Sequence, residues 1–277
     1  MQNAMEMKVK RGWLDRFLGN EPELNAACVC DKGLKRSNNE DNYYFAGRYL
    51  SRDNDGLEGC LSDQTPLPED AFFAVYDGMG GGDYGEVASY TAAAETESFL
   101  GQTDNINPCD ITPSLTRMCL HINEKVFQTG KSLGVHQMGS TLVSLFFHED
   151  QVWVCNLGDS RAFLCRGQKT QQISVDHTDE AEMKANGITN RKPYLTQFLG
   201  IDPEELRIEP FIQSGYYQAG DRYLLCSDGL TDMVDQAVIG EVLIQHEYPE
   251  ECAEKLKQLA LENGGRDNIT VIVIDVY

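Results

Sequence analysis

The chain is short of positive charge. It has 23 Lys and Arg against 44 Asp and Glu, so its formal net charge is −21 at pH 7. Nucleic-acid binding depends on clustered basic residues, and this charge balance argues against it. An acidic surface usually serves solubility, but part of the excess can also belong to a metal site, whose cations reverse the local sign.

The chain also has few features of a zinc protein, a secreted protein or a membrane protein. Its nine cysteines are irregularly spaced, and Cys28 and Cys30 form a C-x-C sequence rather than a paired zinc motif. Cys155 and Cys226 lie inside apolar stretches, which indicates reduced core residues in a cytoplasmic protein. We find no apolar run long enough for a signal peptide or a membrane span.

Residues 1–23 differ in character from the rest of the chain. They are basic, and Trp13, Leu14, Phe17 and Leu18 fall on one side of a helical wheel. One hypothesis is a docking helix for a membrane surface or a partner. The alternative, which we favour, is a flexible N-terminal extension. We therefore expect an extension over 1–23 and a single large domain over 24–277, which at 41% hydrophobic residues can build a sizeable core.

One stretch, Phe72–Gly82 (FFAVYDGMGGG), combines a buried strand with a carboxylate and a run of glycines. An unpaired carboxylate at the edge of a core is costly, so positive charge is expected next to Asp77. Gly78 lacks a side chain, so the backbone can turn sharply there and bring its own carbonyl close to that charge.

The same pattern of a carboxylate at the tip of an apolar strand recurs along the chain. The other carboxylates are Glu40 and Asp41 before Tyr43–Phe45, Asp159 after Val152–Leu157, Asp228 after Arg222–Cys226, and Asp267 before Ile269–Val276. If the sheets bring these tips together, they form an acidic pocket of oxygen ligands. Hard divalent cations such as Mg²⁺ and Mn²⁺ bind pockets of this kind, whereas zinc prefers clustered His and Cys.

The hydrophobic pattern predicts strands in runs joined by short turns, and helices in two separate pairs. Strands are expected at 26–31, 42–50, 72–76, 138–147, 151–157, 161–165, 171–174, around Tyr223 and at 269–276. Helices are expected at 86–100 and 112–127, starting near 227–232, and at 249–262. We expect a surface insertion at 51–70 and a polar loop with a short helical piece at 176–191. Antiparallel sheets with helices packed outside them are the expected result.

Seven short motifs follow one another in a recognisable order. They are RSNNED at Arg36–Asp41, DGMGG at Asp77–Gly81 with GEVAS at Gly85–Ser89, MGST at Met138–Thr141, LGDSR at Leu157–Arg161, DHT at Asp176–Thr178, LCSDGLTD at Leu225–Asp232 and GRDNITV at Gly265–Val271. Over about residues 24–277 the chain resembles the metal-dependent serine/threonine protein phosphatases of type 2C, and among them the compact bacterial enzymes. The resemblance implies an α+β fold, an αββα four-layer sandwich of two central antiparallel sheets flanked by helices, with a metal cleft at one end.

The resemblance also implies a role for each candidate site residue. Asp77 would bridge two Mn²⁺ or Mg²⁺ ions, with the carbonyl of Gly78 on one ion and with Asp228 and Asp267 completing the other. Glu40 and Asp41 would hold waters of the metals, and Arg36 would bind the substrate phosphate. In the bacterial branch a third, weaker ion lies between the aspartates that match Asp159 and Asp228.

The implied activity is hydrolysis of phosphoserine and phosphothreonine on proteins, by attack of a water that bridges two metal ions. The expected partners are phosphorylated proteins and a cognate Ser/Thr kinase, and we expect a cytoplasmic monomer. One alternative is a catalytically silent phosphoprotein-binding module of the same fold, although the intact set of Asp77, Asp228, Asp267 and Arg36 argues against it. A second alternative is a phosphatase for small phosphate esters.

Two departures from the family pattern bear on the mechanism and on substrate choice. Animal members carry a His where this chain has Met79, as is usual in the bacterial branch, and Met cannot donate a proton. The segment after His177, which is a longer flap in bacterial relatives, is short here and comprises only 179–191.

Some of the singled-out residues also have simpler interpretations. Asp-Gly pairs are favoured in turns, and Gly158-Asp159 also suits a hairpin turn. For His177 we favour a structural role, bonding the loop backbone, over that of a general acid. We interpret Cys226 as a core residue, because it lacks the phosphate-binding loop that thiolate phosphatases need.

Overall fold

The structure is a computed structural model that describes residues 23–67, 70–80, 84–102, 106–135 and 137–277. The docking-helix hypothesis for 1–23 lies outside the described residues, apart from Glu23, and so do Gly81 and Gly82 of the glycine run. Glu23 is already the first residue of a strand, because its backbone exchanges hydrogen bonds with that of Tyr277.

Two antiparallel sheets of six strands each form the centre of the molecule. The first has the order β3-β1-β12-β11-β8-β9 and the second β10-β7-β6-β4-β2, with β5 paired to β4. The strands are β1 Glu23–Asp31, β2 Asp41–Phe45, β3 Leu61–Pro66, β4 Ala71–Gly80, β5 Met138–Ser140, β6 Leu142–His148, β7 Gln151–Leu157, β8 Arg161–Arg166, β9 Lys169–Gln172, β10 Phe211–Tyr216, β11 Asp221–Cys226 and β12 Ile269–Val276.

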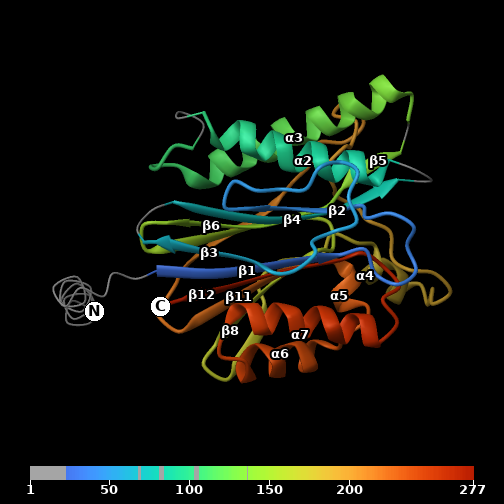
Figure 1. The fold of residues 1–277 in the computed structure, drawn as a ribbon. Coiled ribbons are helices and arrows are strands. Elements are labelled where there is room, and N and C mark those ends of the chain that lie inside the picture. The colour runs from blue at the N-terminus through green and yellow to red at the C-terminus, as the bar shows by residue number, and fades with distance from the viewer. Residues whose placement is uncertain (1–22, 68–69, 81–83, 103–105, 136) are drawn as a thin grey trace.

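Helices cover the outer face of each sheet. The helices of the described residues are α2 Gly85–Leu100, α3 Ile111–Leu133, α4 Glu180–Ala185, α5 Asp228–Thr231, α6 Gln236–Gln245 and α7 Pro249–Glu262. Figure 1 shows α2 and α3 above the sheet of β2, β4 and β6, and α6 and α7 below the sheet of β1, β11 and β12. The predicted four-layer αββα architecture is therefore confirmed.

The alternation of side chains along β4 explains why this strand is central. Phe73 and Val75 point into the core between the two sheets, whereas Phe72, Ala74 and Tyr76 point into the core beneath α2 and α3. A strand buried on both faces is expected to read as a continuous apolar run, as this one does. No described helix is both long and apolar enough to cross a membrane.

Several predicted boundaries were wrong. The strand predicted at 42–50 ends at Phe45, because Ala46 and Gly47 both have positive φ and turn the chain back on itself. The surface insertion predicted at 51–70 contains β3, which pairs with β1. The strand predicted at 138–147 is divided into β5 and β6 at Thr141, whose N–H donates to the carbonyl of Asp77 (2.8 Å).

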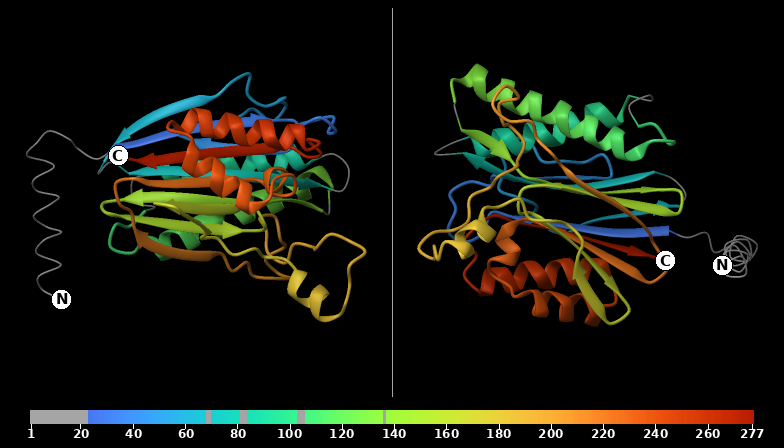
Figure 2. Two further views of the ribbon diagram at one scale, coloured as in Figure 1. Left: turned by 90° about the horizontal axis from the view of Figure 1, so that it is seen from below. Right: turned by 180° about the vertical axis from the view of Figure 1, so that it is seen from behind.

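Other elements were missed or predicted too short. β10 and α6 were not predicted, and α3 runs to Leu133 rather than ending near residue 127. The short helical piece predicted within 176–191 is α4. Figure 2 shows α4 and its flanking loops projecting from the sandwich, at the end opposite the C-terminus where α5 and β5 also lie.

Candidate functional site

Asp77 lies at the centre of a group of acidic side chains. In the pairing of β2 with β4 it stands opposite Asp41, and its N–H donates to the hydroxyl of Thr141 (3.0 Å). Its pKa is raised well above the ordinary value, first by burial and then by the charges of Asp41, Asp228, Asp159 and Asp267. The fold therefore brings these predicted carboxylates into electrostatic contact, although Asp77 lies within β4 rather than at its tip.

Asp41 is a buried carboxylate with two fixed partners. Its Oδ2 accepts hydrogen bonds from the hydroxyls of Ser227 and Thr270, each at 2.7 Å. Burial raises the pKa of Asp41 to about 7, although the two hydrogen bonds lower it. These contacts tie the start of β2 to the tips of β11 and β12, so Asp41 helps to hold the acidic end of the two sheets together.

Asp228 and Asp267 approach each other because Gly229 has no side chain. A Cβ at Gly229 would lie only 1.9 Å from the carbonyl oxygen of Asn268. Any other residue would push the start of α5 away from the tip of β12, where Asp267 lies. The pKa of Asp228 is raised by burial and, among other charges, by that of Asp267.

Gly78 is likewise required by close packing. A Cβ there would lie 2.1 Å from the carbonyl oxygen of Gly85 and 2.4 Å from that of Glu40, and the N–H of Gly78 donates to the latter (3.1 Å). A Cβ at Gly85 would in turn lie 2.9 Å from the carbonyl oxygen of Gly78 and 2.8 Å from the carboxyl carbon of Glu40. The Gly78 carbonyl and the Glu40 carboxylate thus lie side by side.

Asn268 fixes the loop that carries Arg36. Its side-chain amide donates to the carbonyls of Lys32 (2.8 Å) and Asn38 (3.0 Å), and its Oδ1 accepts from the N–H of Glu40 (2.8 Å). Asn268 belongs to the GRDNITV motif, but its role here depends on contacts that the motif alone does not indicate. With only 2% of its surface exposed, it connects the loop after β1 to the start of β12.

Arg36 lies beside the acidic group. Its guanidinium donates to Asp267 (Nη2 to Oδ2, 2.7 Å) and to Glu40 (Nη1 to Oε2, 3.4 Å), and 43% of its side chain is exposed. The candidate phosphate ligand is therefore next to two candidate metal-site residues.

Asp159 and His177 lie at the same end of the two sheets as the acidic group, on the side from which α4 projects. Burial, and then the charge of Asp228, raises the pKa of Asp159 to about 7. His177 donates its backbone N–H to the carbonyl of Gly158 (3.0 Å), and its Nδ1 accepts from the N–H of Gly158 (3.3 Å). The predicted structural role of His177 is confirmed, and burial lowers the pKa of its ring.

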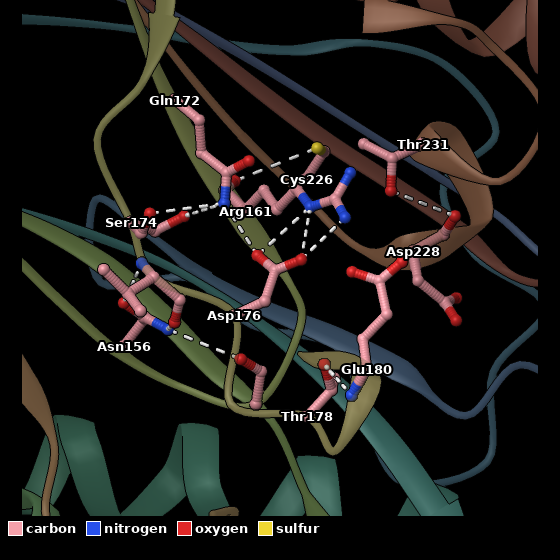
Figure 3. Close-up of polar contacts among 12 residues, drawn as sticks. Asn156, Arg161, Gln172, Ser174, Asp176, Thr178, Glu180, Cys226, Asp228 and Thr231 are labelled. Atoms are coloured by element: carbon pink, nitrogen blue, oxygen red, sulfur yellow. Dashed lines mark hydrogen bonds and ion pairs between the residues drawn. The ribbon is translucent and has the colours of Figure 1, made fainter. Parts of the chain in front are cut away.

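Arg161 and Asp176 form a fork-like ion pair that the sequence analysis missed. Arg161 donates to Oδ2 of Asp176 from Nε (2.9 Å) and from Nη2 (2.6 Å), and Gln172 donates to Oδ1 (2.7 Å). Figure 3 shows both side chains reaching the Asp176 carboxylate, with Asp228 nearby on α5. The pair fixes the start of the segment that carries His177, and both residues belong to motifs that could have drawn attention to them.

Lys192 is a second residue that the sequence did not reveal. Its ammonium lies 3.4 Å from Oδ2 of Asp228 and forms an ion pair with Asp232 as well. Lys192 belongs to no motif, and it meets α5 only through the fold. It ties the end of the segment after His177 to a candidate metal ligand.

The acidic group suits hard divalent cations by the chemistry of its donors. Its oxygens come from carboxylates, with the Gly78 carbonyl beside them, and burial together with mutual repulsion raises the pKa of several members. Among the described residues, no three His, Cys, Asp or Glu side chains are already gathered as a metal-ligand cluster. Asp228 is instead paired with Lys192, and Asp267 with Arg36.

Cys226 lies within the core, as predicted. Its side chain is fully buried, burial raises its pKa to about 12, and its thiol lies 3.8 Å from the carbonyl oxygen of Arg161. A thiol with such a pKa is not a thiolate at neutral pH, so Cys226 is not a nucleophile.

Comparisons with known proteins agree with this geometry. The family model described as Protein phosphatase 2C matches residues 50–197. The chain is 33% identical over 266 residues to the serine/threonine protein phosphatase PstP of Mycobacterium tuberculosis, a match that covers 91% of this chain and 45% of PstP. It is 29% identical to the serine/threonine phosphatase stp of Listeria monocytogenes, with 91% of this chain and 96% of that protein covered.

The solved structures agree as well. The catalytic domain of PstP in complex with two manganese ions is similar over 92% of this chain and 99% of that one, with a TM-score of 0.71 and 30% sequence identity. This chain therefore spans less than half the length of PstP but nearly all of its catalytic domain. The fold, the motif order and these matches lead to one conclusion: the chain belongs to the protein phosphatase 2C family.

Proposed function

We propose that this chain is a Mn²⁺- or Mg²⁺-dependent protein phosphatase that hydrolyses phosphoserine and phosphothreonine. The observation that carries the proposal is the convergence of Asp41, Asp77, Asp228 and Asp267, from four separate parts of the chain, beside Arg36. Relatives over most of this chain are named serine/threonine phosphatases, and one of them is described with two manganese ions.

In this proposal the core ligands of two cations are Asp77, Asp228, Asp267 and the carbonyl of Gly78. Glu40 and Asp41 would orient water at the site, and Asp159 with Asp228 would hold a third ion. Divalent cations, when bound, supply positive charge that lowers the pKa of water and stabilises the charge developing on a phosphoryl group.

The chain's own residues hold and orient the substrate. The planar guanidinium of Arg36 can donate two parallel hydrogen bonds to phosphate, and its partial exposure leaves it accessible. Asn268 holds the Arg36 loop, and the hydroxyls of Ser227 and Thr270 hold Asp41, so the site is organised before the substrate binds.

The proton for the leaving oxygen comes from water in this proposal. Met79 has no proton to donate. Burial lowers the pKa of His177, so the protonated ring that could donate is less populated at neutral pH, and its Nδ1 accepts a backbone hydrogen bond and has no proton to give.

We also propose that the protein acts in the cytoplasm as a monomer, on phosphoproteins made by a Ser/Thr kinase. All nine cysteines are free, and Cys119 and Cys155 remain thiols although their sulfurs lie 3.5 Å apart. Unpaired cysteines in this number suit a reducing compartment.

The test is hydrolysis of a phosphothreonine peptide and of p-nitrophenyl phosphate by the wild-type protein, with Mn²⁺, with Mg²⁺ and with EDTA. Turnover of the peptide that needs a divalent cation supports the proposal. Turnover of p-nitrophenyl phosphate alone would favour a small-ester phosphatase. No turnover of either substrate by folded protein in Mn²⁺ would overturn the enzymatic proposal.

A further inference from the structure

We propose that a cavity beside the candidate active site binds an apolar side chain of the protein substrate, two or three residues away from the phosphorylated residue. This inference rests on the proposed phosphatase function and names a feature of its substrates.

The cavity has a volume of about 830 Å³ and lies between the C-terminal end of α3, β5 and residues 198–205. Its walls include the apolar side chains of Phe127, Val135, Met138, Phe198 and Ile201. Cavities of roughly 300–1,000 Å³ whose walls combine apolar side chains with polar groups are typical of binding sites. The volume is ample for one large aliphatic or aromatic side chain.

The walls of the cavity are held by buried hydrogen bonds. Asn123 on α3, with 2% of its surface exposed, accepts from the N–H groups of Gly200 (2.8 Å) and Ile201 (3.0 Å) and donates to the carbonyl of Ile201 (2.9 Å). Ser140 and Leu199 exchange two backbone hydrogen bonds of 2.9 and 2.8 Å. Because these contacts fix the walls before binding, a side chain that enters the cavity orders few groups of the protein, and the entropic cost of binding is small.

Met79 connects the cavity to the acidic group. It contributes to the cavity wall and stands two residues after Asp77 on β4, so both side chains point to the same face of the strand. Two residues along a strand span about 7 Å. A bound peptide advances by roughly 3.3–3.6 Å per residue, so a side chain two or three positions from the phosphoresidue reaches the cavity.

The residue type at position 79 suits this use. A methionine side chain is flexible and polarizable, and adapts to apolar groups of different shape. Met79 is thus an apolar wall shared between the active site and the cavity.

Charged residues at the rim define the occupant further. Lys131 lies over the ring of Phe127 at 5.8 Å, and Asp202 and Glu205 stand on the other wall. An apolar floor with a polar rim is typical of the pocket that receives an anchoring side chain of a peptide. The two acids outnumber the lysine, so a neutral or basic residue beside the anchor is favoured over an acidic one.

The first part of the test needs only wild-type protein. Phosphothreonine peptides carrying Leu or Ala at position −3, −2, +2 or +3 are compared in Mn²⁺, beside p-nitrophenyl phosphate. We expect kcat/KM to be about tenfold higher for Leu at one or more positions, the discrimination that a few methylene groups provide in an apolar pocket.

The second part uses a matched pair of variants. Val135→Asp puts a charge in the cavity wall and should reduce the Leu-to-Ala ratio of kcat/KM to about one. Leu133→Asp, at an exposed residue two positions earlier and outside the cavity, should keep the wild-type ratio. If Val135→Asp does not fold, the wild-type comparison still decides.

The outcomes separate this inference from the proposed function. Equal kcat/KM for Leu and Ala at every position, with both p-nitrophenyl phosphate and peptides hydrolysed, overturns the inference and leaves the phosphatase proposal intact. The same holds if Val135→Asp retains the full Leu preference. Absence of all metal-dependent turnover would instead overturn the function on which the inference rests.

Discussion

Removing the side-chain amide of Asn268 should destabilise the protein and impair phosphate binding together. Asn268→Ala removes three hydrogen bonds, to Lys32, Asn38 and Glu40, all of them part of the loop that carries Arg36. At roughly 1 kcal/mol of net stability for each bond, the free energy of unfolding should fall by about 3 kcal/mol. For a chain of this size that corresponds to a fall in Tm of about 6–12 °C.

The assay is thermal unfolding in EDTA, so that bound cations do not contribute, followed by kcat/KM on a phosphothreonine peptide in Mn²⁺. We expect kcat/KM to fall by about tenfold or more, because the Arg36 guanidinium is no longer held in place. Asn186→Ala is the matched control, since Asn186 is exposed on the projecting α4 segment and its side chain makes one hydrogen bond, to the carbonyl of Glu182 (3.0 Å).

The control should change Tm by less than about 2 °C, as is usual for surface substitutions. If Asn268→Ala melts within 2 °C of the wild type, by the same standard, then Asn268 does not hold the loop. If it loses stability but keeps full kcat/KM, then the hydrogen bonds of Asn268 do not position Arg36 for phosphate binding.

Three further predictions concern Cys226, Asp159 and Lys192. Cys226→Ala should keep kcat within about twofold of wild type, because a buried thiol with a pKa of about 12 is no nucleophile; loss of all turnover would contradict this. Burial raises the pKa of Asp159 to about 7, so between about pH 4 and 7 the folded protein binds more protons than the unfolded chain. The free energy of unfolding in EDTA should therefore fall as the pH rises through this range, and it should fall more for the wild type than for Asp159→Asn. The same difference in Tm between wild type and Asp159→Asn at about pH 5 and at about pH 7 would contradict the raised pKa of Asp159. Lys192→Met should tighten Mn²⁺ binding measured by calorimetry, because the ammonium competes for Asp228; unchanged affinity would show that it does not.

Elements with a strong local signal could be predicted from the sequence almost to the residue. The run ITVIVIDV gives β12 at Ile269–Val276, and the Pro at the start of α7 marks its first turn. Asp77, Asp228 and Asp267 could be found in the same way, because each carboxylate follows or precedes an apolar run of the sequence. Asp228 and Asp267 flank β11 and β12, whereas Asp77 lies within β4, which runs on to Gly80.

The elements that were missed have weak local signals. β3 (LSDQTP) is polar and half-exposed, and it is a strand because β1 offers it an edge to pair with. β10 contains Ser and Gly and is largely exposed, so its pairing with β7 likewise decides its conformation. In both strands, pairing with a neighbouring strand outweighed the low intrinsic strand propensity of the sequence.

The contacts that organise the site could not be predicted for a related reason. Asn268 reaches Asn38 across 230 positions of the sequence, and Lys192 reaches Asp228 across 36. Such pairs depend on how two sheets and a projecting segment pack together, and a single sequence carries no periodic signal for them. The cavity beside Met79 is similarly formed by three segments that are distant in sequence.

The measurement that tests the central claim most directly is hydrolysis of a phosphothreonine peptide by the Asp228→Asn variant in Mn²⁺. Asp235→Asn is the matched control, because Asp235 is an exposed residue that precedes α6 and makes no side-chain capping hydrogen bond. We predict that the control keeps wild-type turnover, whereas Asp228→Asn loses a factor of about 100 or more while still folding. Wild-type turnover by Asp228→Asn would contradict the assignment of the acidic group as a metal-dependent catalytic site.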